Sequence, residues 1–244
     1  MLCTERGERV PALKESEKPK VFRALVNVRA PMAASSEFLR VQNEYLREEL
    51  RQKGITDCET LTPIAPDICL WKGDITALKC DAIVNAANSR LLGCFCPNHG
   101  CVDNAIHTFA GVQLRQECAE IMKAQGEEEP TGQAKITKAY NLPCKYVLHT
   151  VGPIVCGNLT QNNEERLESC YRSCLELAHS RGLKSIAFCC ISTGEFHFPN
   201  ERAAEIAIKT VNEFKARTQS EIKVIFNVFK DYDYEIYFRL LKAD

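Results

Sequence analysis

The second half of this chain alternates between strand-like and helix-like segments, and this order constrains the fold more than any other feature. Residues 162–181 and 201–217 carry apolar side chains at helical spacing, and residues 234–242 form a closing helix-like segment. Residues 185–191 and 222–229 lie between them, and the first of these is a continuous apolar run, typical of a strand buried on both faces. This alternation predicts an α/β fold in three layers, with a mixed central sheet and helices on both of its faces.

The segment before this alternating half predicts more elements of the same kind. Residues 103–124 place apolar side chains on one helical face. Four shorter runs read as strands: residues 68–71, 82–85, 133–138 and 146–151.

The first part of the chain has a different character. Residues 1–33 are rich in charge and weakly periodic, so we expect loops and a short helix there. Residues 35–52 predict a helix that Ser36 can cap and Gly54 can end. Two prolines then interrupt the chain before the main domain. We therefore expect an N-terminal helical extension over residues 1–66 and an α/β domain over residues 67–244.

Composition narrows the class of protein. The chain has 244 residues, 45% of them hydrophobic, and a formal net charge of −1. This suffices for one sizeable core and gives no basic field to attract nucleic acid or an anionic membrane. The charged N-terminus lacks the apolar centre of a secretory signal, and no apolar run approaches a membrane span. These features predict a cytoplasmic protein, in which most of the 14 cysteines are buried as small apolar side chains.

One short segment collects side chains that bind metals. Residues 93–104 hold three cysteines, one histidine and one carboxylate, and thiolates with imidazole are the ligands that zinc prefers. The paired Cys-x2-Cys spacing of structural zinc sites does not occur here, whereas three protein ligands with an open fourth position are the catalytic pattern. Spacing alone leaves two alternatives open, since Cys96 can replace Cys94 as a ligand and the cluster can reflect a cysteine-rich composition. The metal-capable residues are Cys94, Cys96, His99 and Cys101.

Three loops that follow predicted strands suit a phosphorylated ligand. Asp74 can accept a hydrogen bond from an exocyclic amine, or it can simply cap the next turn. Asn85 and Asn88 can bond ribose hydroxyls, or they can form a turn. The small residues of 191–196 let backbone N–H groups converge on an anion, or they form an ordinary tight turn, and Phe196 in this loop can cover a ligand ring or pack.

Taken together, these motifs resemble a macrodomain over residues 67 to about 230, in order and in spacing. In most hydrolytic macrodomains a glycine-rich segment precedes the aspartate, and residues 94–101 replace it here. The chain thus resembles the zinc-dependent branch, to which its helical extension over residues 22–61 is also similar. These enzymes remove mono-ADP-ribose from proteins, and some are encoded beside a sirtuin-type ADP-ribosyltransferase. The motifs are residues 73–76, 85–88, 103–107 with 110–111, 149–153 and 191–194.

The resemblance implies a role for each matching residue. Cys94, His99 and Cys101 would hold Zn²⁺, with the distal ribose completing the coordination, and this selects Cys94 over Cys96. Asp74 would bind the adenine amine. The residues implied to contact the ligand are Asp74 and Ile75 at the adenine, Asn88 and Asp103 at the distal ribose, Ser192, Thr193, Gly194, Glu195 and Phe196 around the diphosphate and its ribose, and Val102 as a further ligand-binding residue.

The implied function is hydrolysis of the bond between ADP-ribose and an acidic side chain, at the anomeric carbon or at the ester. Asp103 would orient or deprotonate the water, and Asn88 would position the sugar. The implied partners are ADP-ribose, a mono-ADP-ribosylated protein and a sirtuin-type ADP-ribosyltransferase system. Two alternatives remain: an ADP-ribose-binding reader whose zinc is structural, and a phosphatase that acts on a small ADP-ribose phosphate.

Overall fold

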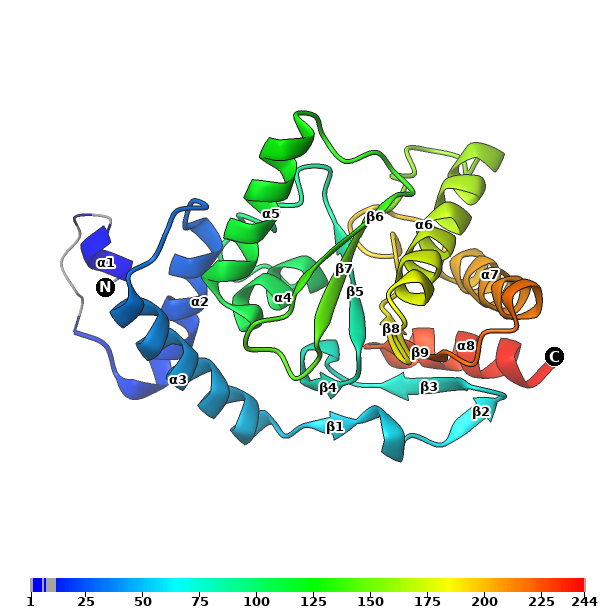
Figure 1. The fold of residues 1–244 in the computed structure, drawn as a ribbon, viewed down its shortest axis with the longest axis horizontal. Coiled ribbons are helices and arrows are strands. Elements are labelled where there is room, and N and C mark those ends of the chain that lie inside the picture. The colour runs from blue at the N-terminus through cyan, green and yellow to red at the C-terminus, as the bar shows by residue number, and fades with distance from the viewer. Residues whose placement is uncertain (1, 6, 8–11, 244) are drawn as a thin grey trace.

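A seven-stranded mixed sheet forms the centre of the computed structural model, which describes residues 2–5, 7 and 12–243 (Figure 1). The two edge strands β2 and β6 run antiparallel to their neighbours, and the five strands between them are parallel. The expected mixed sheet is therefore confirmed. Across the sheet the strands are β2 (Pro63–Ala65), β3 (Ile68–Lys72), β9 (Lys223–Val228), β8 (Ser185–Phe188), β5 (Ala82–Ala87), β7 (Tyr146–Val151) and β6 (Ala134–Lys138). A separate parallel pair joins β1 (Thr56–Asp57) to β4 (Leu78–Lys79).

Helices lie on both sides of this sheet, as the alternating sequence predicts. Figure 1 shows α4 (Val102–Ala110) and α5 (Val112–Gln125) on one side of the central strands. The opposite side carries α6 (Gln161–Ser180) and α7 (Asn200–Thr218), and α8 (Asp231–Ala243) closes the chain beside α7. This is a three-layer α/β/α arrangement.

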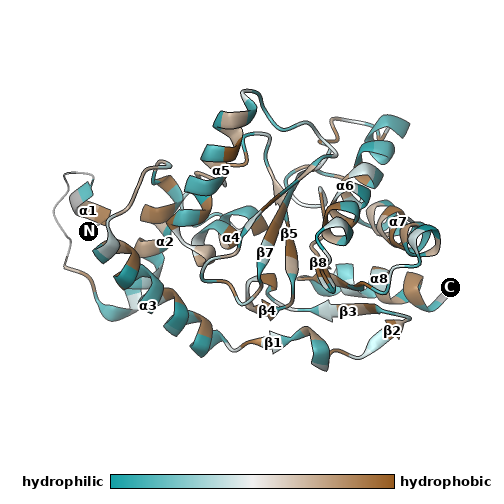
Figure 2. Ribbon diagram, viewed as in Figure 1, coloured by the Kyte–Doolittle hydropathy of each residue, from teal (hydrophilic) through white to brown (hydrophobic). Residues whose placement is uncertain are grey.

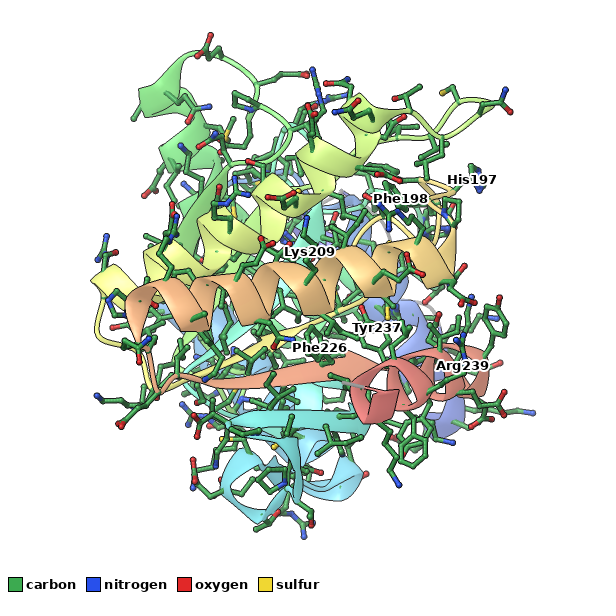
Figure 3. The ribbon with its side chains drawn as sticks, turned by 90° about the vertical axis from the view of Figure 1, so that its right-hand side faces the viewer. His197, Phe198, Lys209, Phe226, Tyr237 and Arg239 are labelled. Atoms are coloured by element: carbon green, nitrogen blue, oxygen red, sulfur yellow. The ribbon has the colours of Figure 1, made fainter. Side chains whose placement is uncertain are left out.

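The core follows from the apolar strands. Ile83, Val84 and Leu148 are fully buried, and the hydropathy colouring shows brown along β5 and β7 (Figure 2). Closer to the β2 edge of the sheet, Tyr237 of α8 packs on Phe226 of β9, with ring centroids 5.1 Å apart (Figure 3). Burial of such side chains removes apolar surface from water, which is the main favourable term in folding.

The N-terminal helices pack outside α4 and α5 (Figure 1). The extension contains α1 (Leu2–Glu5), a 3-10 turn (Glu15–Glu17), α2 (Lys18–Val28) and α3 (Ser36–Lys53). The sequence indicated only loops and a short helix before residue 33, whereas α2 spans 11 residues. The two strands β1 and β2 also precede residue 67, and the division of the chain at residue 66 stays a prediction.

Two boundaries differ from the sequence-based expectation. The helix expected over residues 103–124 is two helices, because Gly111 adopts φ 97°, a conformation that ends α4 and begins α5. The cap of α3 is Ser35, whose side chain accepts a hydrogen bond from the N–H of Phe38, and Ser36 is the first helical residue.

One carboxylate joins the starting ends of three central strands. Asp81 Oδ2 accepts the N–H of Lys184 at 2.6 Å, and its Oδ1 lies 2.6 Å from Lys145 Nζ. The carbonyl of Asp81 accepts the N–H groups of Lys145 and Tyr146, and its own N–H donates to Ser185 Oγ at 2.8 Å. Burial raises the pKa of Asp81, but the bonds from Lys145 and Lys184 outweigh it and leave the pKa below its usual value.

Replacing this carboxylate tests its contribution to stability. Asp81→Asn should lower the free energy of unfolding by about 1–3 kcal/mol at pH 7, because the contacts with the Lys184 N–H and the Lys145 ammonium group lose the carboxylate charge. A carboxyl whose pKa is depressed by folding stabilises above the unfolded pKa of about 3.9 and loses that effect as pH falls below it. Urea unfolding between pH 7 and pH 3 should therefore show the difference from wild type shrinking below about pH 4.

The matched control is Glu44→Gln, which removes an exposed carboxylate paired with Arg40 on α3. Its unfolding free energy should stay close to wild type throughout this pH range. A loss in Asp81→Asn that does not change with pH would contradict the assigned role of its charge.

Candidate functional site

The loops at one edge of the sheet meet because β3, β9, β8, β5 and β7 are parallel. After β5 the chain forms β6 and then β7 on one side of β5, and it then crosses back to β8 on the other side. Such a reversal leaves a crevice at the carboxyl ends of the strands, where α/β proteins bind ligands. The loops that meet there follow Lys72, Ala87, Val151, Phe188 and Val228.

The cysteine-rich loop lies between β5 and α4. Donor atoms of Cys94, His99 and Cys101 all lie within 4.8 Å of one another, so these three residues could hold a metal ion. Cys101 caps α4, since its Sγ accepts the N–H of Asn104 at 3.4 Å. Cys96 is exposed and lies outside this group. The structure thus brings together the three residues selected by the family resemblance.

The ring of His99 is oriented between two loops. Its Nδ1 lies 3.6 Å from Cys94 Sγ, and its Nε2 lies 3.5 Å from Oε1 of Glu195 in the loop after β8. A metal-binding histidine commonly uses one ring nitrogen for the metal and points the other at a carboxylate. In this ring Nδ1 faces a thiol and Nε2 faces a carboxylate.

A second group of possible metal ligands is fully buried. Donor atoms of His107, Cys118 and His149 lie within 4.8 Å of one another and could also hold an ion. The ring of His149 already has partners, since Nε2 is 2.9 Å from Thr137 Oγ1 and Nδ1 is 3.2 Å from Asn85 Nδ2. Neither ring nitrogen of His107 has a hydrogen-bond partner among the described residues. Sequence spacing could not reveal this group, because its members come from α4, α5 and β7.

Asp103 lies beside both groups. Its carboxylate is 5% exposed and accepts hydrogen bonds from Asn85 Nδ2 at 2.8 Å and from Asn88 Nδ2 at 3.4 Å. The Nε2 atom of His107 is 3.5 Å from Asp103 Oδ1. Burial raises the pKa of Asp103 to about 6, against the opposing effect of Asn85, Arg115 and Asn88. The structure therefore brings Asn88 and Asp103 together, and Val102 begins the same helix.

Asp74 is more fully bonded than the sequence indicated. Its Oδ1 accepts the N–H and the hydroxyl of Thr76, so it caps the 3-10 turn Ile75–Ala77. Its Oδ2 lies 2.7 Å from Nζ of Lys53, at the end of α3. These bonds lower the pKa of Asp74, although burial, the largest single effect, raises it. Ile75 is buried in the turn.

An aromatic side chain that the sequence analysis missed lies next to this turn. Phe229 directly follows β9 and is 76% exposed. The strand before it joins the turn of Asp74, because the N–H of Gly73 donates to the carbonyl of Val228 at 3.0 Å. An exposed aromatic residue at the carboxyl end of a strand is a signal that the sequence alone could have supplied.

The loop after β8 is folded against the loop after β7. The N–H of Val155 donates to the carbonyl of Phe196 at 2.9 Å, and Ser192 adopts φ 64°. The buried Oγ of Ser192 has no partner within the part of the chain that the structure describes. A Cβ on Gly194 would meet no described atom within 4 Å, so the loop borders open space there. Thr193, Gly194 and Glu195 are at least partly exposed beside it.

Comparison with known proteins identifies this architecture. The family model described as Macro domain matches residues 84–207. The chain is also 57% identical over 231 residues to a protein of Treponema medium named Protein-ADP-ribose hydrolase, covering 93% of this chain and 88% of that one. The chain belongs to the macro domain family.

Solved macrodomain structures share the fold. An Oceanobacillus iheyensis macrodomain with ADP superposes with a TM-score of 0.66 at 39% identity, over 75% of this chain and 95% of that one. A Trypanosoma brucei macrodomain in complex with ADP-ribose superposes with a TM-score of 0.69 at 32% identity, over 95% of this chain and 97% of that one. Across residues 2–5, 7 and 12–243 of this macrodomain, no helix is both long and apolar enough to cross a membrane.

The contact between the two loops can be tested through Gly152. A Cβ at this position would overlap Ser192 Oγ and lie 2.9 Å from Ile191 Cγ2, so the loop after β8 must shift. Gly152→Ala should lower the free energy of unfolding by about 1–3 kcal/mol, as overpacking of a tight contact does. Gly194→Ala is the matched control, and chemical unfolding should leave it near wild type. Equal stability of all three proteins would show that the loops do not press on each other.

Proposed function

We propose that this macrodomain is a zinc-dependent hydrolase that removes mono-ADP-ribose from acidic side chains of modified proteins. The observation that carries the proposal is the meeting of a Cys94–His99–Cys101 group with Asp103 at the switch point of the sheet. The relative from Treponema medium is named Protein-ADP-ribose hydrolase, and the structure from Trypanosoma brucei holds ADP-ribose. A sirtuin-type ADP-ribosyltransferase system would supply the modified protein.

The partly exposed group fits zinc better than the buried one. Cys94, His99 and Cys101 offer two thiolates and one imidazole, and Glu195 faces the other nitrogen of the ring. Three protein ligands leave an open position, as in catalytic zinc sites. In the buried group, by contrast, both nitrogens of His149 already face polar partners. Zinc, when bound, would act as a Lewis acid on an oxygen of the substrate or lower the pKa of water.

The remaining residues suit the parts of ADP-ribose. Asp74 would accept the adenine amine beside Ile75, and Phe229 would offer its exposed ring as a surface for the base. The loop from Ser192 to Phe196 would bind the diphosphate and its ribose in the open space at Gly194. Asn88, Val102 and Asp103 would face the distal ribose.

Asp103 would perform the proton transfer. Asn85 and Asn88 hold its carboxylate in place, and a neighbouring water would donate its proton to this carboxylate during attack. The water oxygen would bond to the anomeric carbon or to the ester carbonyl carbon, and the bond to the acidic side chain would break. ADP-ribose and the free carboxyl group are the products. Binding of the diphosphate supplies energy away from the bond that breaks.

Removing the carboxylate separates an enzyme from a reader. Asp103→Ala should bind ADP-ribose with an affinity near wild type but lose at least about 100-fold in release of ADP-ribose from a glutamate- or aspartate-modified protein. Calorimetry gives the affinity, and a radiolabelled substrate gives the release. Undiminished release would remove Asp103 from the chemistry. A wild-type protein that binds ADP-ribose and releases none would instead be a reader, and phosphate release from an ADP-ribose phosphate would indicate the phosphatase.

Three cysteine variants test the metal. Cys101→Ala should lose one equivalent of zinc and its turnover, because it removes one of three ligands. Cys96→Ala and Cys118→Ala should keep that zinc, since the first thiol lies outside the group and the second belongs to the buried group. Elemental analysis after dialysis measures zinc, and an assay with a chelator measures its need. Loss of zinc in Cys118→Ala alone would assign the ion to the buried group.

A further inference from the structure

We infer that helix α2 of the N-terminal extension is part of the metal centre, with Arg23 and Asn27 as positioning residues that hold the metal-binding loop in its ligating shape. The inference rests on the proposed zinc site. Helix α2 lies outside the residues matched by the family model, and the family resemblance assigns no residue of α2 a role beside the cysteines.

Arg23 reaches from α2 to the loop at His99 and to the first turn of α4 at Asn104. Its Nη2 donates to the carbonyl of His99 at 2.9 Å, and its Nε and Nη2 donate to Oδ1 of Asn104 at 2.9 and 2.8 Å. The side chain of Asn104 in turn donates to the carbonyl of Cys96 at 2.9 Å, and its N–H donates to Cys101 Sγ at 3.4 Å. One guanidinium therefore connects the backbone at His99 with the helix turn that presents Cys101.

Asn27 holds the other side of the same peptide segment. Its side chain is 1% exposed, and its Oδ1 accepts the N–H of Asn98 at 2.9 Å. Its Nδ2 donates to Thr108 Oγ1 at 3.0 Å, and that hydroxyl donates to the carbonyl of Asn104 at 2.7 Å. Asn98 has φ 57°, a left-handed conformation that an isolated loop would not strongly favour.

These contacts fix His99 from both directions. The N–H of Asn98 and the carbonyl of His99 are both bonded to α2. Between Cys94 and Cys101 the described backbone bonds include a single turn, from the N–H of His99 to the carbonyl of Cys96 at 3.2 Å. A loop with so few bonds of its own depends on its neighbours for a defined shape.

The end of α2 is itself anchored to the main domain. Arg115 of α5 donates from Nη1 to the carbonyls of Val26 and Arg29, and from Nε to the carbonyl of Leu92 just before the loop. The helix and the start of the loop thus share one support. Pre-ordering of ligands lowers the entropy cost of binding the ion, and loss of such supporting contacts weakens metal sites by about 10–100-fold.

Two substitutions of Arg23 test this role in the full-length protein. Arg23→Lys keeps a positive charge but loses the planar fork that makes the three bonds, and Arg23→Ala removes the side chain. Both should weaken zinc binding by about 10–100-fold in competition with a chromophoric chelator. They should also alter the thiolate-to-cobalt absorption of the Co²⁺-substituted protein, since the ligands no longer hold one geometry. Arg40→Ala, which removes an exposed arginine of α3 paired with Glu44, is the matched control and should match wild type in both measurements.

The outcomes are distinct. Zinc affinity and cobalt spectra equal to wild type in both Arg23 variants would overturn the inference. Equal drops in the melting temperature of the zinc-free and zinc-bound proteins, with affinity unchanged, would also overturn it, because they indicate a role in folding only. If Arg23→Ala does not fold, Arg23→Lys decides. A wild-type protein without zinc would instead refute the proposed metal centre, and the role of α2 with it.

Discussion

The parallel pairing of β7, β5 and β8 is the constraint on which the site depends. These three strands are parallel, so the loops that follow them all lie at the same edge of the sheet. The strand β5 lies between β7 and β8, and the chain passes from one side of β5 to the other. Asp81 fixes the register from the opposite end, by bonding the starts of the same strands. Gly152 and Ser192 therefore lie against each other, although they are far apart in sequence. The loops can vary in shape while the strands determine where each one begins.

Much of the architecture could be predicted from the sequence. The apolar run at residues 185–191 predicted a buried strand, and the strand β8 begins there but ends at Phe188. The alternation of strand-like and helix-like segments predicted the three-layer arrangement. The spacing of Cys94, His99 and Cys101 indicated a possible metal group because the three residues lie within one loop. The sequence did not predict that the helix would break at Gly111. The apolar stripe continues through this residue, and the break depends on a single positive φ.

The remaining parts of the site could not be predicted, because they depend on contacts between distant segments. Lys53 pairs with Asp74 across 21 positions, and Arg23 reaches Asn104 across 81. Neither arginine nor lysine has a local pattern that specifies such a partner. The group of His107, Cys118 and His149 has the same origin, since α4, α5 and β7 become neighbours only when the sheet and its helices assemble.

Asp103 lies two residues after Cys101 and beside His107 of the buried group, and its surroundings explain its raised pKa. Asn85 donates from one amide nitrogen to Asp103 and also faces His149. Burial lowers the pKa of His149 to about 3 and that of His107 well below its usual value, so both rings are neutral near pH 7. Two neutral imidazoles provide no positive charge to balance the carboxylate, and Arg115 opposes the effect of burial only in part. A carboxylate with a raised pKa accepts a proton more readily than an exposed aspartate does. General bases are most effective when their pKa lies near the working pH, and the raised pKa lies closer to neutral pH. The buried rings of His107 and His149 thus leave the pKa of Asp103 raised, because they add no positive charge beside it.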